Sequence, residues 1–265
     1  MPLQTKGKIL ANKQVNEQDY KLVVSVPEII EELVPGQFLH VKCTEGLDPL
    51  LRRPLSIHKY DEEKGELIIL YRVFGKGTKA LSRRESGEEI DLMGPLGNGF
   101  DLFNLKERIM VVGGGIGSAP LMALIERLVE LNKEVTVLIG ANNQDQILCE
   151  SKLKELATEL KFATVDGSYG YKGYITELLA EKLKQNEYDQ IFACGPTPML
   201  KAMEPVIEDK DIDVQVSLEA RMGCGTGACL SCVCKVKVQN DDGFAYKKVC
   251  TDGPVFNMDE VILDE

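Results

Sequence analysis

Four cysteines in the C-terminal part of the chain have the spacing of metal ligands. Cys224, Cys229 and Cys232 form a C-x₄-C-x₂-C run, and Cys250 follows well downstream. Thiolates in this pattern hold the two irons of a plant-type [2Fe–2S] cluster. The two glycines inside the run allow the main chain to adopt positive φ angles and to turn its N–H groups toward the inorganic sulfides. The pattern therefore predicts a [2Fe–2S] cluster bound by these four cysteines.

Two other uses of these cysteines stay open at this point. A structural zinc site would normally show two C-x₂₋₄-C pairs, whereas one pair is well formed here and Cys250 stands alone. Buried, inert thiols are the second alternative, although three cysteines in one glycine-rich loop are not typical of core packing. Cys234 follows Cys232 closely, at the start of a strand expected over Cys234–Val238. We interpret Cys234 as a packed strand residue and not as a ligand.

Two stretches of the N-terminal part carry groups suited to binding a phosphate. The segment Arg52–Ser56 places a guanidinium, which can grip a pyrophosphate through paired hydrogen bonds, before a proline and a hydroxyl at the start of a strand. The segment Leu70–Thr78 runs from a strand into two glycines and a threonine that can cap the next helix. Both also have an ordinary explanation, because Arg-Pro pairs and Gly-x-Gly-Thr turns are common in loops.

Two further stretches lie where open α/β sheets collect ligands. Gly113–Pro120 joins the apolar strand Arg108–Val112 to the amphipathic helix Leu121–Leu131. It lacks the third glycine of the Rossmann pattern, since Ala119-Pro120 stands there, so it predicts either a phosphate loop or tight strand–helix packing. Cys194–Leu200 follows another expected strand at its carboxyl end, where we expect a ligand.

Two kinds of scaffold must position these groups. The N-terminal part shows short strands separated by turn residues, which is typical of an antiparallel barrel. Its expected strands are Gly7–Gln14, Tyr20–Val26, Gln37–Cys43, Leu55–Tyr60, Glu66–Arg72 and Glu89–Met93, with a short helix over Gly77–Arg84. The middle part alternates strands and helices, which predicts a parallel, doubly wound sheet. After Leu131 its expected elements are Glu134–Ile139, helix Glu150–Leu160, Lys161–Val165, helix Ile175–Lys184, Gln190–Ala193, helix Pro198–Glu208 and Val214–Leu218.

The chain is therefore expected to be an α+β multidomain protein. An antiparallel β-barrel domain is expected over residues 1–103, an α/β parallel-sheet domain over 104–213 and a C-terminal [2Fe–2S] domain over 214–265. A length of 265 residues is sufficient for three small domains, each with its own core.

Composition limits the partners and the compartment. The net charge of −11 argues against nucleic acid or an anionic membrane as a partner. The sequence contains no apolar run of about 18 residues that would form a membrane-spanning helix, and the N-terminus lacks the apolar core of a signal peptide. Eight cysteines, clustered in such a chain, indicate metal binding in a reducing compartment. We therefore expect a cytoplasmic protein.

The phosphate-binding stretches together resemble the ferredoxin reductase superfamily. The resemblance implies that the barrel binds FAD, with Arg53 on the pyrophosphate and Ser56 near the flavin N5. The other FAD-binding residues that it implies are Pro54 and Leu55 beside Arg53, Leu70, Tyr71 and Arg72 along the isoalloxazine and ribityl, and Gly77 and Thr78 at the phosphates. It further implies an NAD(H)-binding domain, in which Gly114, Gly115 and Gly117 face the pyrophosphate and Cys194 and Gly195 approach the nicotinamide. Ser56 and Cys194 are thus the candidate catalytic residues.

The nucleotide preference follows from the residues after the strand Lys161–Val165. NADP-using relatives usually place Ser-Arg here to hold the 2′-phosphate, whereas this chain has Asp166. A carboxylate repels that phosphate and accepts hydrogen bonds from ribose hydroxyls. We therefore predict NADH over NADPH.

The whole chain, and above all Leu218–Cys232, resembles the electron-transfer subunits of type B dihydroorotate dehydrogenases. The resemblance implies an FMN-containing catalytic subunit as the partner, in a heterotetramer of two copies each. Arg221, Met222 and Gly225–Ser231 are then the interface candidates. The small subunit of NADH-dependent ferredoxin:NADP oxidoreductase has the same layout but usually carries Asp at the first ligand position, where this chain has Cys224. Sulfhydrogenase-type reductase subunits, a stand-alone NADH:acceptor reductase and a non-catalytic zinc-binding scaffold are the remaining alternatives.

The histidines and the tail offer no further catalytic group. His40 and His58 both fall within expected barrel strands, without a Ser, Cys or acidic neighbour in sequence that would complete a triad, so we interpret both as structural. The tail Asn257–Glu265 carries four carboxylates around Val261-Ile262-Leu263. It is either a solvated terminus or a segment whose apolar trio packs on a neighbouring element.

Overall fold

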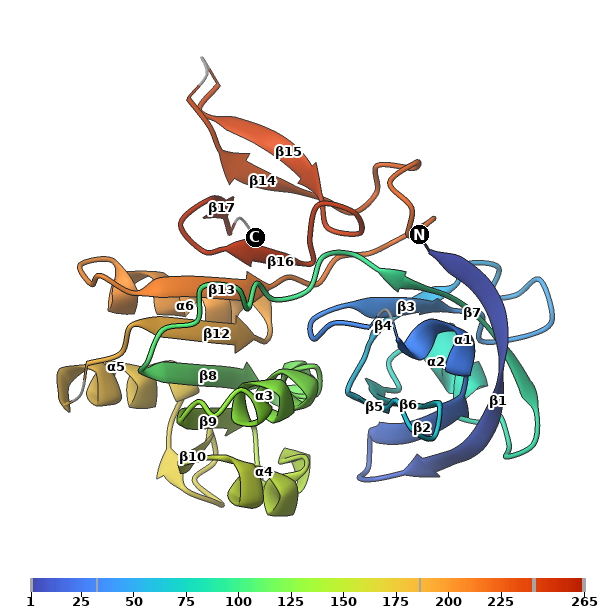
Figure 1. Cartoon of the computed structure of the whole chain (residues 1–265), viewed down its shortest axis with the longest axis horizontal. Coiled ribbons are helices and arrows are strands. Elements are labelled where there is room, and N and C mark those ends of the chain that lie inside the picture. Colours follow the sequence, from blue (N-terminus) through green and yellow to red (C-terminus); the bar gives the residue numbers. More distant parts are fainter. Residues whose placement is uncertain (1, 32, 186, 240–241, 264–265) are drawn as a thin grey trace.

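The computed structural model describes residues 2–31, 33–185, 187–239 and 242–263. Within these residues the chain forms three sheets. Figure 1 shows a curled N-terminal sheet beside a layered parallel sheet, with the C-terminal segment lying over both. This is the expected arrangement of an antiparallel barrel, an α/β domain and a C-terminal cluster segment. The expected divisions after residues 103 and 213 stay predictions.

The N-terminal sheet is antiparallel throughout and curls into a half-open barrel in the order β4-β3-β7-β1-β2-β6-β5. In β7 every second residue is buried, as expected of a strand with one face on a core. The strands are β1 Leu3–Gln14, β2 Asp19–Ser25, β3 Phe38–Val41, β4 Arg53–Ser56, β5 Lys59–Asp61, β6 Glu66–Arg72 and β7 Glu89–Leu96, with the helices α1 Pro27–Ile30 and α2 Lys76–Leu81.

One expected barrel strand is wrong in its extent. Leu55–Tyr60 is divided between β4 and β5, because the chain leaves the first sheet edge at Ser56 and joins the opposite edge at Lys59. Ile57 and His58, between these two strands, are both buried. His58 therefore lies between two strands and not, as had been expected, within one.

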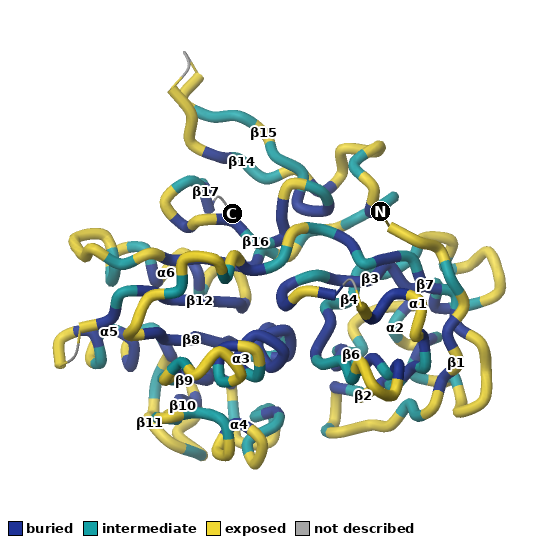
Figure 2. Tube along the Cα trace, in the orientation of Figure 1, coloured by how far each residue is buried: buried dark blue, intermediate teal, exposed yellow. Residues whose placement is uncertain are grey.

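The second sheet is parallel from β11 to β13, in the order β11-β10-β9-β8-β12-β13-β16. Its central strand β8 is buried along its whole length, as Figure 2 shows, because helices cover both faces. Its strands are β8 Ile109–Gly114, β9 Val135–Ala141, β10 Glu159–Thr164, β11 Tyr171–Lys172, β12 Gln190–Cys194 and β13 Asp213–Ser217. Its helices are η1 Gly115–Ser118, α3 Leu121–Glu130, η2 Gln144–Gln146, α4 Glu150–Leu156, α5 Ile175–Gln185 and α6 Thr197–Ile207.

One expected helix of this domain is too long. The predicted helix Glu150–Leu160 ends at Leu156, because Glu159 and Leu160 already pair with β9 as the start of β10. The helix α3 matches its prediction closely, and its buried residues Leu121, Leu124, Ile125 and Leu128 form the expected apolar face.

The C-terminal segment joins both other parts. Its strand β16 Val255–Asn257 adds antiparallel to β13, while β14 Val233–Lys237, β15 Phe244–Lys248 and β17 Val261–Ile262 form a small sheet of their own. Val261 and Leu263 are buried, which confirms that the apolar part of the tail packs on a neighbour. The last two tail carboxylates, Asp264 and Glu265, lie outside the described residues.

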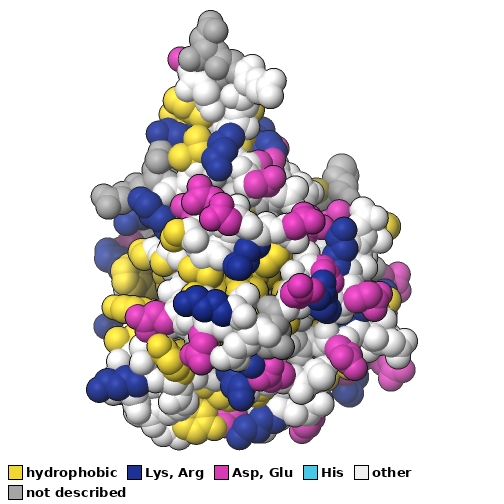
Figure 3. All heavy atoms as spheres, turned by 90° about the vertical axis from the view of Figure 1, so that its left-hand side faces the viewer, with side chains coloured by type: hydrophobic (Ala, Val, Ile, Leu, Met, Phe, Trp, Pro, Cys, Tyr) yellow, Lys and Arg dark blue, Asp and Glu magenta, His cyan; other side chains and the backbone are white. Residues whose placement is uncertain are grey.

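The face of the molecule on the side of the parallel sheet carries side chains of both charges. Figure 3 shows Lys and Arg side chains intermixed with Asp and Glu over that face. None of the helices in the described part of the chain is long and apolar enough to cross a membrane.

Candidate redox site

The loop that carries Cys224 and Cys229 directs main-chain N–H groups at sulfur. The N–H groups of Thr226 and Cys229 both donate to the Cys224 Sγ at 3.4 Å. Gly225 and Gly227 have φ angles of 74° and 80°, which turn the chain back on itself around that sulfur. Burial raises the pKa of the Cys224 thiol, but these N–H groups together outweigh burial and bring it to about 6. The loop thus favours the thiolate, which is the metal-binding form.

The four predicted ligands meet as two pairs. The thiols of Cys224 and Cys229 influence each other's pKa, and so do those of Cys232 and Cys250, because the two members of each pair lie close together. Burial and the nearby Cys232 raise the pKa of Cys250 to about 11. Among the described residues, no three His, Cys, Asp or Glu side chains are placed to hold one metal ion. Two thiolate pairs fit two irons better than one tetrahedral zinc.

Cys234 lies on β14 and is half-buried against the core beneath the cluster segment. Burial raises the pKa of its thiol to about 11. This confirms its interpretation as a packed strand residue.

A cavity of about 480 Å³ lies where the barrel, the parallel sheet and the segment before Cys224 meet. From the barrel it is lined by Phe38, Pro54, Leu55, Ser56, Leu70, Tyr71, Arg72 and Phe74. From the parallel-sheet domain it is lined by Ile116, Gly117, Ala119, Pro120 and Cys194, and from the C-terminal part by Ser217, Leu218, Glu219, Ala220, Met222 and Pro254. A mostly apolar cavity with a few polar groups, between domains, suits a flat aromatic cofactor.

Beside this cavity, Arg53 packs against the start of α2. A Cβ on Gly77 would lie 2.6 Å from the Arg53 Nε, so only glycine allows this approach. The Thr78 Oγ accepts hydrogen bonds from the N–H groups of Phe74 and Gly75. The structure therefore brings together the three residues expected at the FAD phosphates.

On β6 the side chains alternate between the cavity and the barrel core. Leu70 packs against Ala119 of the parallel-sheet domain. Tyr71 also borders the cavity, but its ring is buried in the barrel core and stacked on Tyr20. Arg72 returns to the cavity and is held by Asp19 through two N–O contacts of 2.8 and 3.0 Å.

The glycine turn after β8 is shaped largely by packing. A Cβ on Gly117 would lie 2.6 Å from the Cα of Gly195, and one on Gly114 would lie 2.4 Å from the Met199 sulfur. Gly115, in contrast, has a φ of 55° and open space where a Cβ would stand. Of the three glycines expected to face a pyrophosphate, Gly115 alone has open space in the direction of a Cβ, while Gly117 borders the central cavity.

Cys194 reaches the cavity from the end of β12. Its thiol is buried, and burial raises its pKa to about 12, with Ser217 beside it as a hydrogen-bond partner. It is therefore a neutral thiol at physiological pH and not a nucleophile. Glu219 is exposed to the open cavity, but the surrounding protein removes part of its water. This desolvation raises the pKa of its carboxyl, and the charge of Arg72 lowers it.

Asp166 lies directly after β10 at the carboxyl edge of the parallel sheet. Its Oδ1 accepts hydrogen bonds from the N–H and the Oγ of Ser168, at 2.9 and 2.6 Å, which hold the pKa of the carboxyl below its usual range. The carboxylate is thus charged and fixed at the place where a ribose is expected.

The two histidines lie at contacts between segments. The Nδ1–H of His58 donates to the Ala119 carbonyl at 2.7 Å, which leaves the His58 Nε2 to accept from the Cys149 thiol at 3.6 Å. The ring of His40 is also buried but has no hydrogen-bond partner of good geometry at either nitrogen. Burial, and next the Arg52 charge, lower the pKa of His40 to about 4, while burial lowers that of His58 to about 4.

Three family descriptions match consecutive parts of the chain. They are an oxidoreductase FAD-binding domain over residues 6–100, an oxidoreductase NAD-binding domain over 111–204 and the iron-sulfur cluster binding domain of dihydroorotate dehydrogenase B over 219–262. A relative from Geobacillus sp. (strain WCH70), 45% identical over 96% of this chain and 97% of its own length, is named dihydroorotate dehydrogenase B (NAD(+)), electron transfer subunit. A relative from Desulforamulus reducens with the same name is 42% identical over 97% of this chain and 98% of its own length. This chain belongs to that family.

Solved structures agree with the family assignment. The structure of an NADH-dependent reduced ferredoxin-NADP oxidoreductase is 30% identical, with a TM-score of 0.86 over 97% of this chain and 90% of that one. A ferredoxin NADP⁺ reductase from Neisseria gonorrhoeae shares the fold at 20% identity and a TM-score of 0.67, over 78% of this chain and 91% of that one. The expected fold class and the FAD-, NAD- and cluster-binding domains of an electron-transfer subunit of dihydroorotate dehydrogenase B are thereby confirmed.

Sequence reasoning missed several residues of the central cavity. Phe38, Ser217, Glu219 and Met222 line it but stand outside the phosphate-binding stretches. Glu219 and Met222 were visible as neighbours of Cys224 in the sequence. Nothing in the sequence showed that the chain returns to the barrel at this point.

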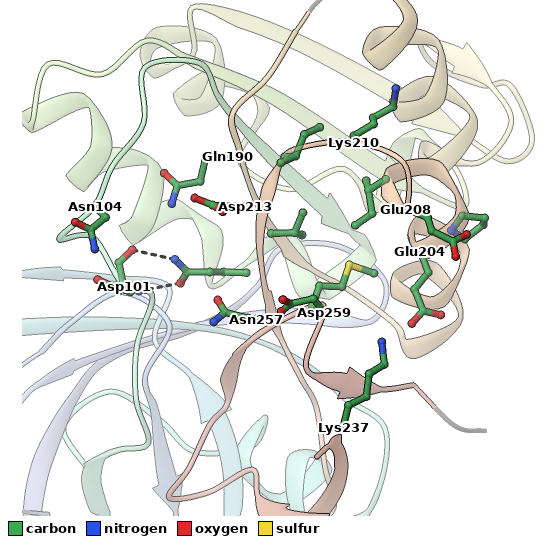
Figure 4. Close-up of a pocket in the computed structure, with 16 residues that line it drawn as sticks. Asp101, Asn104, Gln190, Glu204, Glu208, Lys210, Asp213, Lys237, Asn257 and Asp259 are labelled. Carbon is green, nitrogen blue, oxygen red and sulfur yellow. Dashed lines mark hydrogen bonds between the residues drawn. The ribbon is translucent and has the colours of Figure 1, made fainter. Parts of the chain in front are cut away.

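A second cavity, of about 760 Å³, lies at the opposite, amino ends of β12 and β13. Figure 4 shows Glu204 from α6, Glu208 directly after that helix, and Lys237 from β14, at its border. Gln215 exchanges two hydrogen bonds with the main chain of Asp101 there, which ties the interdomain linker to β13. None of the residues predicted to bind a cofactor lines this cavity.

Proposed function

We propose that this chain carries electrons between a catalytic subunit that oxidises dihydroorotate to orotate and NAD⁺, by way of a [2Fe–2S] cluster and FAD. One observation carries the proposal: the barrel, the nucleotide domain and the segment leading into Cys224 line a single cavity. A flavin in that cavity would contact all three parts. The two sulfur pairs and the apolar, interdomain cavity fit a binuclear cluster and a flavin respectively.

The residues of this chain then have distinct roles. Cys224, Cys229, Cys232 and Cys250 hold the cluster. When bound, FAD exchanges a hydride with NAD(H) and single electrons with the cluster. Ser56 borders the cavity from the barrel and Cys194 borders it from the parallel sheet, so each would contact one of the two reacting rings. Because the Cys194 thiol is neutral, it orients the nicotinamide without reacting with it.

The remaining predicted contacts divide between FAD, on the side of the barrel, and NAD(H), on the side of the parallel sheet. Arg53, Pro54, Leu55, Gly77 and Thr78 would hold the FAD phosphates and ribityl, while Leu70 and Arg72 face the flavin and Tyr71 supports them from the core. On the other side, Gly115 and Gly195 would approach NAD(H), and Gly114 and Gly117 shape that loop. Asp166 would accept hydrogen bonds from the adenosine ribose, which favours NADH.

The partner would be an FMN-containing catalytic subunit, in a heterotetramer of two copies each. Arg221, Met222 and the loop over residues 225–231 are the proposed contact surface. In that loop Leu230 is 61% exposed and has a φ of 58°, an unusual conformation for leucine. A large apolar side chain held in solvent in this way favours a protein contact. The eight free cysteines support a cytoplasmic location.

A second candidate is a reductase subunit that serves a different partner. The likeness to an NADH-dependent reduced ferredoxin-NADP oxidoreductase favours it. Cys224, at the position where that group usually has Asp, favours the dihydroorotate partner instead. Co-expression with candidate catalytic subunits and a dihydroorotate:NAD⁺ assay distinguishes the two.

The cluster itself is tested on the purified chain. We expect brown protein with about two irons and one flavin per chain, and a rhombic EPR signal on reduction. Single Ser substitutions at Cys224, Cys229, Cys232 and Cys250 should each lose or change that signal, whereas Cys234→Ser, the matched control, should keep it. Colourless protein that holds zinc would overturn the proposal.

A further inference from the structure

The outer face of β3 and β7 supports the cluster segment. Along β3 the residues alternate, so that Leu39 and Val41 point into the barrel core while Phe38 and His40 point outward. Phe38 and Leu96 belong to the same apolar cluster as Cys232 and Cys250. Leu96 also borders a small surface cavity together with Gly225 and Cys250. The barrel therefore lies beside the cluster-binding segment.

His40 is the polar exception on this apolar surface. Its residue is 1% exposed, and neither ring nitrogen has a hydrogen-bond partner of good geometry. A buried polar group left unpaired destabilises the folded state, so an apolar side chain would be the better choice if packing were its only role. An imidazole at this position, unlike an apolar side chain, can interact with a neighbouring peptide through its ring nitrogens.

The ring lies directly against the peptide that follows the first ligand. A Cβ on Gly225 would stand 2.8 Å from the His40 Nδ1 and 3.2 Å from its Cγ, so this position requires glycine. The backbone of Cys224 is also close enough to act on the imidazole as a hydrogen-bond partner. The Leu96 Cδ1 would lie 3.3 Å from the same Cβ, so His40 is the polar member of the barrel surface that encloses this peptide.

We propose that His40 is a positioning residue for the [2Fe–2S] centre, and that its imidazole fixes the Cys224–Gly225 peptide and adds an N–H dipole at that end of the cluster. The inference rests on the proposed function, because it requires the cluster. Hydrogen bonds and dipoles around the sulfurs are among the factors that set the potential of such centres. Through His40, the domain that holds the flavin would tune the centre with which the flavin exchanges electrons.

The test compares His40→Leu with a matched control. Leu removes both nitrogens at similar volume, and His58→Leu removes the other buried imidazole of the same barrel, whose nitrogens are already paired with Ala119 and Cys149. We expect His40→Leu to keep its FAD, to show a more negative cluster midpoint potential and changed EPR g-values, and to lose iron to a chelator roughly fivefold faster. His58→Leu should match the wild type in all three cluster readouts.

The outcomes distinguish a failure of the proposed function from a failure of the role proposed for His40. A wild-type chain without the EPR signal of a [2Fe–2S] cluster overturns the proposed function. A normal wild type, together with a His40→Leu variant whose potential, g-values and iron release are unchanged, overturns the role of His40 alone. If His40→Leu fails to bind FAD, His40→Met is judged by the same three readouts. Partial recovery of the wild-type potential in His40→Gln, which keeps an N–H donor, would support the inference.

Discussion

The carboxylate of Asp19 fixes the guanidinium that faces the flavin cavity. Asp19 is fully buried, while the side chain of Arg72 is 25% exposed at the cavity border. Asp19→Asn removes the charge but keeps the shape, so Arg72 loses both charge-assisted contacts. We expect a loss of about 2–3 kcal/mol in the free energy of unfolding, since a partly buried charge is left without its partner. Urea unfolding followed by circular dichroism measures it, because the chain contains no tryptophan for fluorescence.

The matched control for Asp19 is the ion pair between Lys6 and Glu89. Its N–O distance of 2.8 Å resembles that of the buried pair, but both side chains are 69% exposed. Water and salt screen such a pair, so Glu89→Gln should unfold as the wild type does. Equal losses in the two variants would contradict the argument that burial makes the Asp19 contact strong.

At the nucleotide site, Asp166 is expected to decide between NADH and NADPH. Its carboxylate is exposed and held by Ser168, so it stands charged where a 2′-phosphate would lie. Asp166→Asn removes the repulsion, and we expect kcat/KM for NADPH to rise roughly tenfold with a smaller change for NADH. Steady-state reduction of a one-electron dye by each nucleotide measures this. Asp211→Asn, an exposed carboxylate in the loop before β13, should leave the ratio unchanged.

Among single residues, the sequence predicted the cluster-binding cysteines better than the residues that pack around the cofactor sites. The spacing of Cys224, Cys229 and Cys232 predicted the cluster-binding domain, because these three cysteines are close together along the chain. His40 was interpreted as structural, since its contact with Gly225 joins residues far apart in sequence. Tyr71 was expected at the flavin; it borders the cavity, and strand alternation turns its ring into the barrel core. A contact between residues far apart in sequence leaves no regular spacing in the sequence from which it could be predicted.

Among the elements, the turn between β8 and η1 provides a test of where NAD(H) binds. Gly115 has a φ of 55°, and a Cβ added there would meet no atom within 4 Å apart from those of its chain neighbours, so the space beside it is free for a bound nucleotide. We expect Gly115→Ala to raise KM for NADH at least tenfold, because the main chain can no longer approach the phosphates closely. The backbone strain should also lower the unfolding free energy by about 1 kcal/mol.

Gly87 gives the matched control for this turn. It has a φ of 95° and equally open surroundings, but it lies in the turn before β7. Gly87→Ala should cause a similar loss of stability with no change in KM for NADH. If both variants raised KM alike, or neither did, the assignment of Gly115 to the pyrophosphate would be wrong.

The elements themselves were largely predictable, and the errors have a common cause. Apolar periodicity located α3 and most strands of the parallel sheet, because one face of each is buried. The helix α4 and the pair β4 and β5 were drawn too long, since apolar residues continue across a break that only tertiary pairing shows. The three-residue strand β16 was not predicted, because so short a segment pairs only when β13 is already in place.

At the scale of the whole molecule, a neutral His58 lies in the contact between the flavin and nucleotide domains. Its Nδ1–H bonds the Ala119 carbonyl, its own carbonyl accepts from the Ala123 N–H, and Lys59 next to it pairs with Glu126 on α3. Protonation would place a charge in this buried interface and convert the Nε2 from an acceptor for the Cys149 thiol into a second donor. Burial therefore lowers the pKa of His58 from 6.5 to about 4.

This shift predicts how the stability of the assembled domains depends on pH. The unfolded chain binds a proton at His58 below pH 6.5, whereas the folded chain does so only near pH 4, so acid favours unfolding between these values. His58 alone should account for a loss of about 3 kcal/mol between pH 7 and pH 4. Unfolding free energies of the wild type and His58→Gln across this range measure it by difference, because their carboxylates titrate alike. A difference between the two that stays constant from pH 7 to pH 4 would show that His58 is not held neutral by the interface.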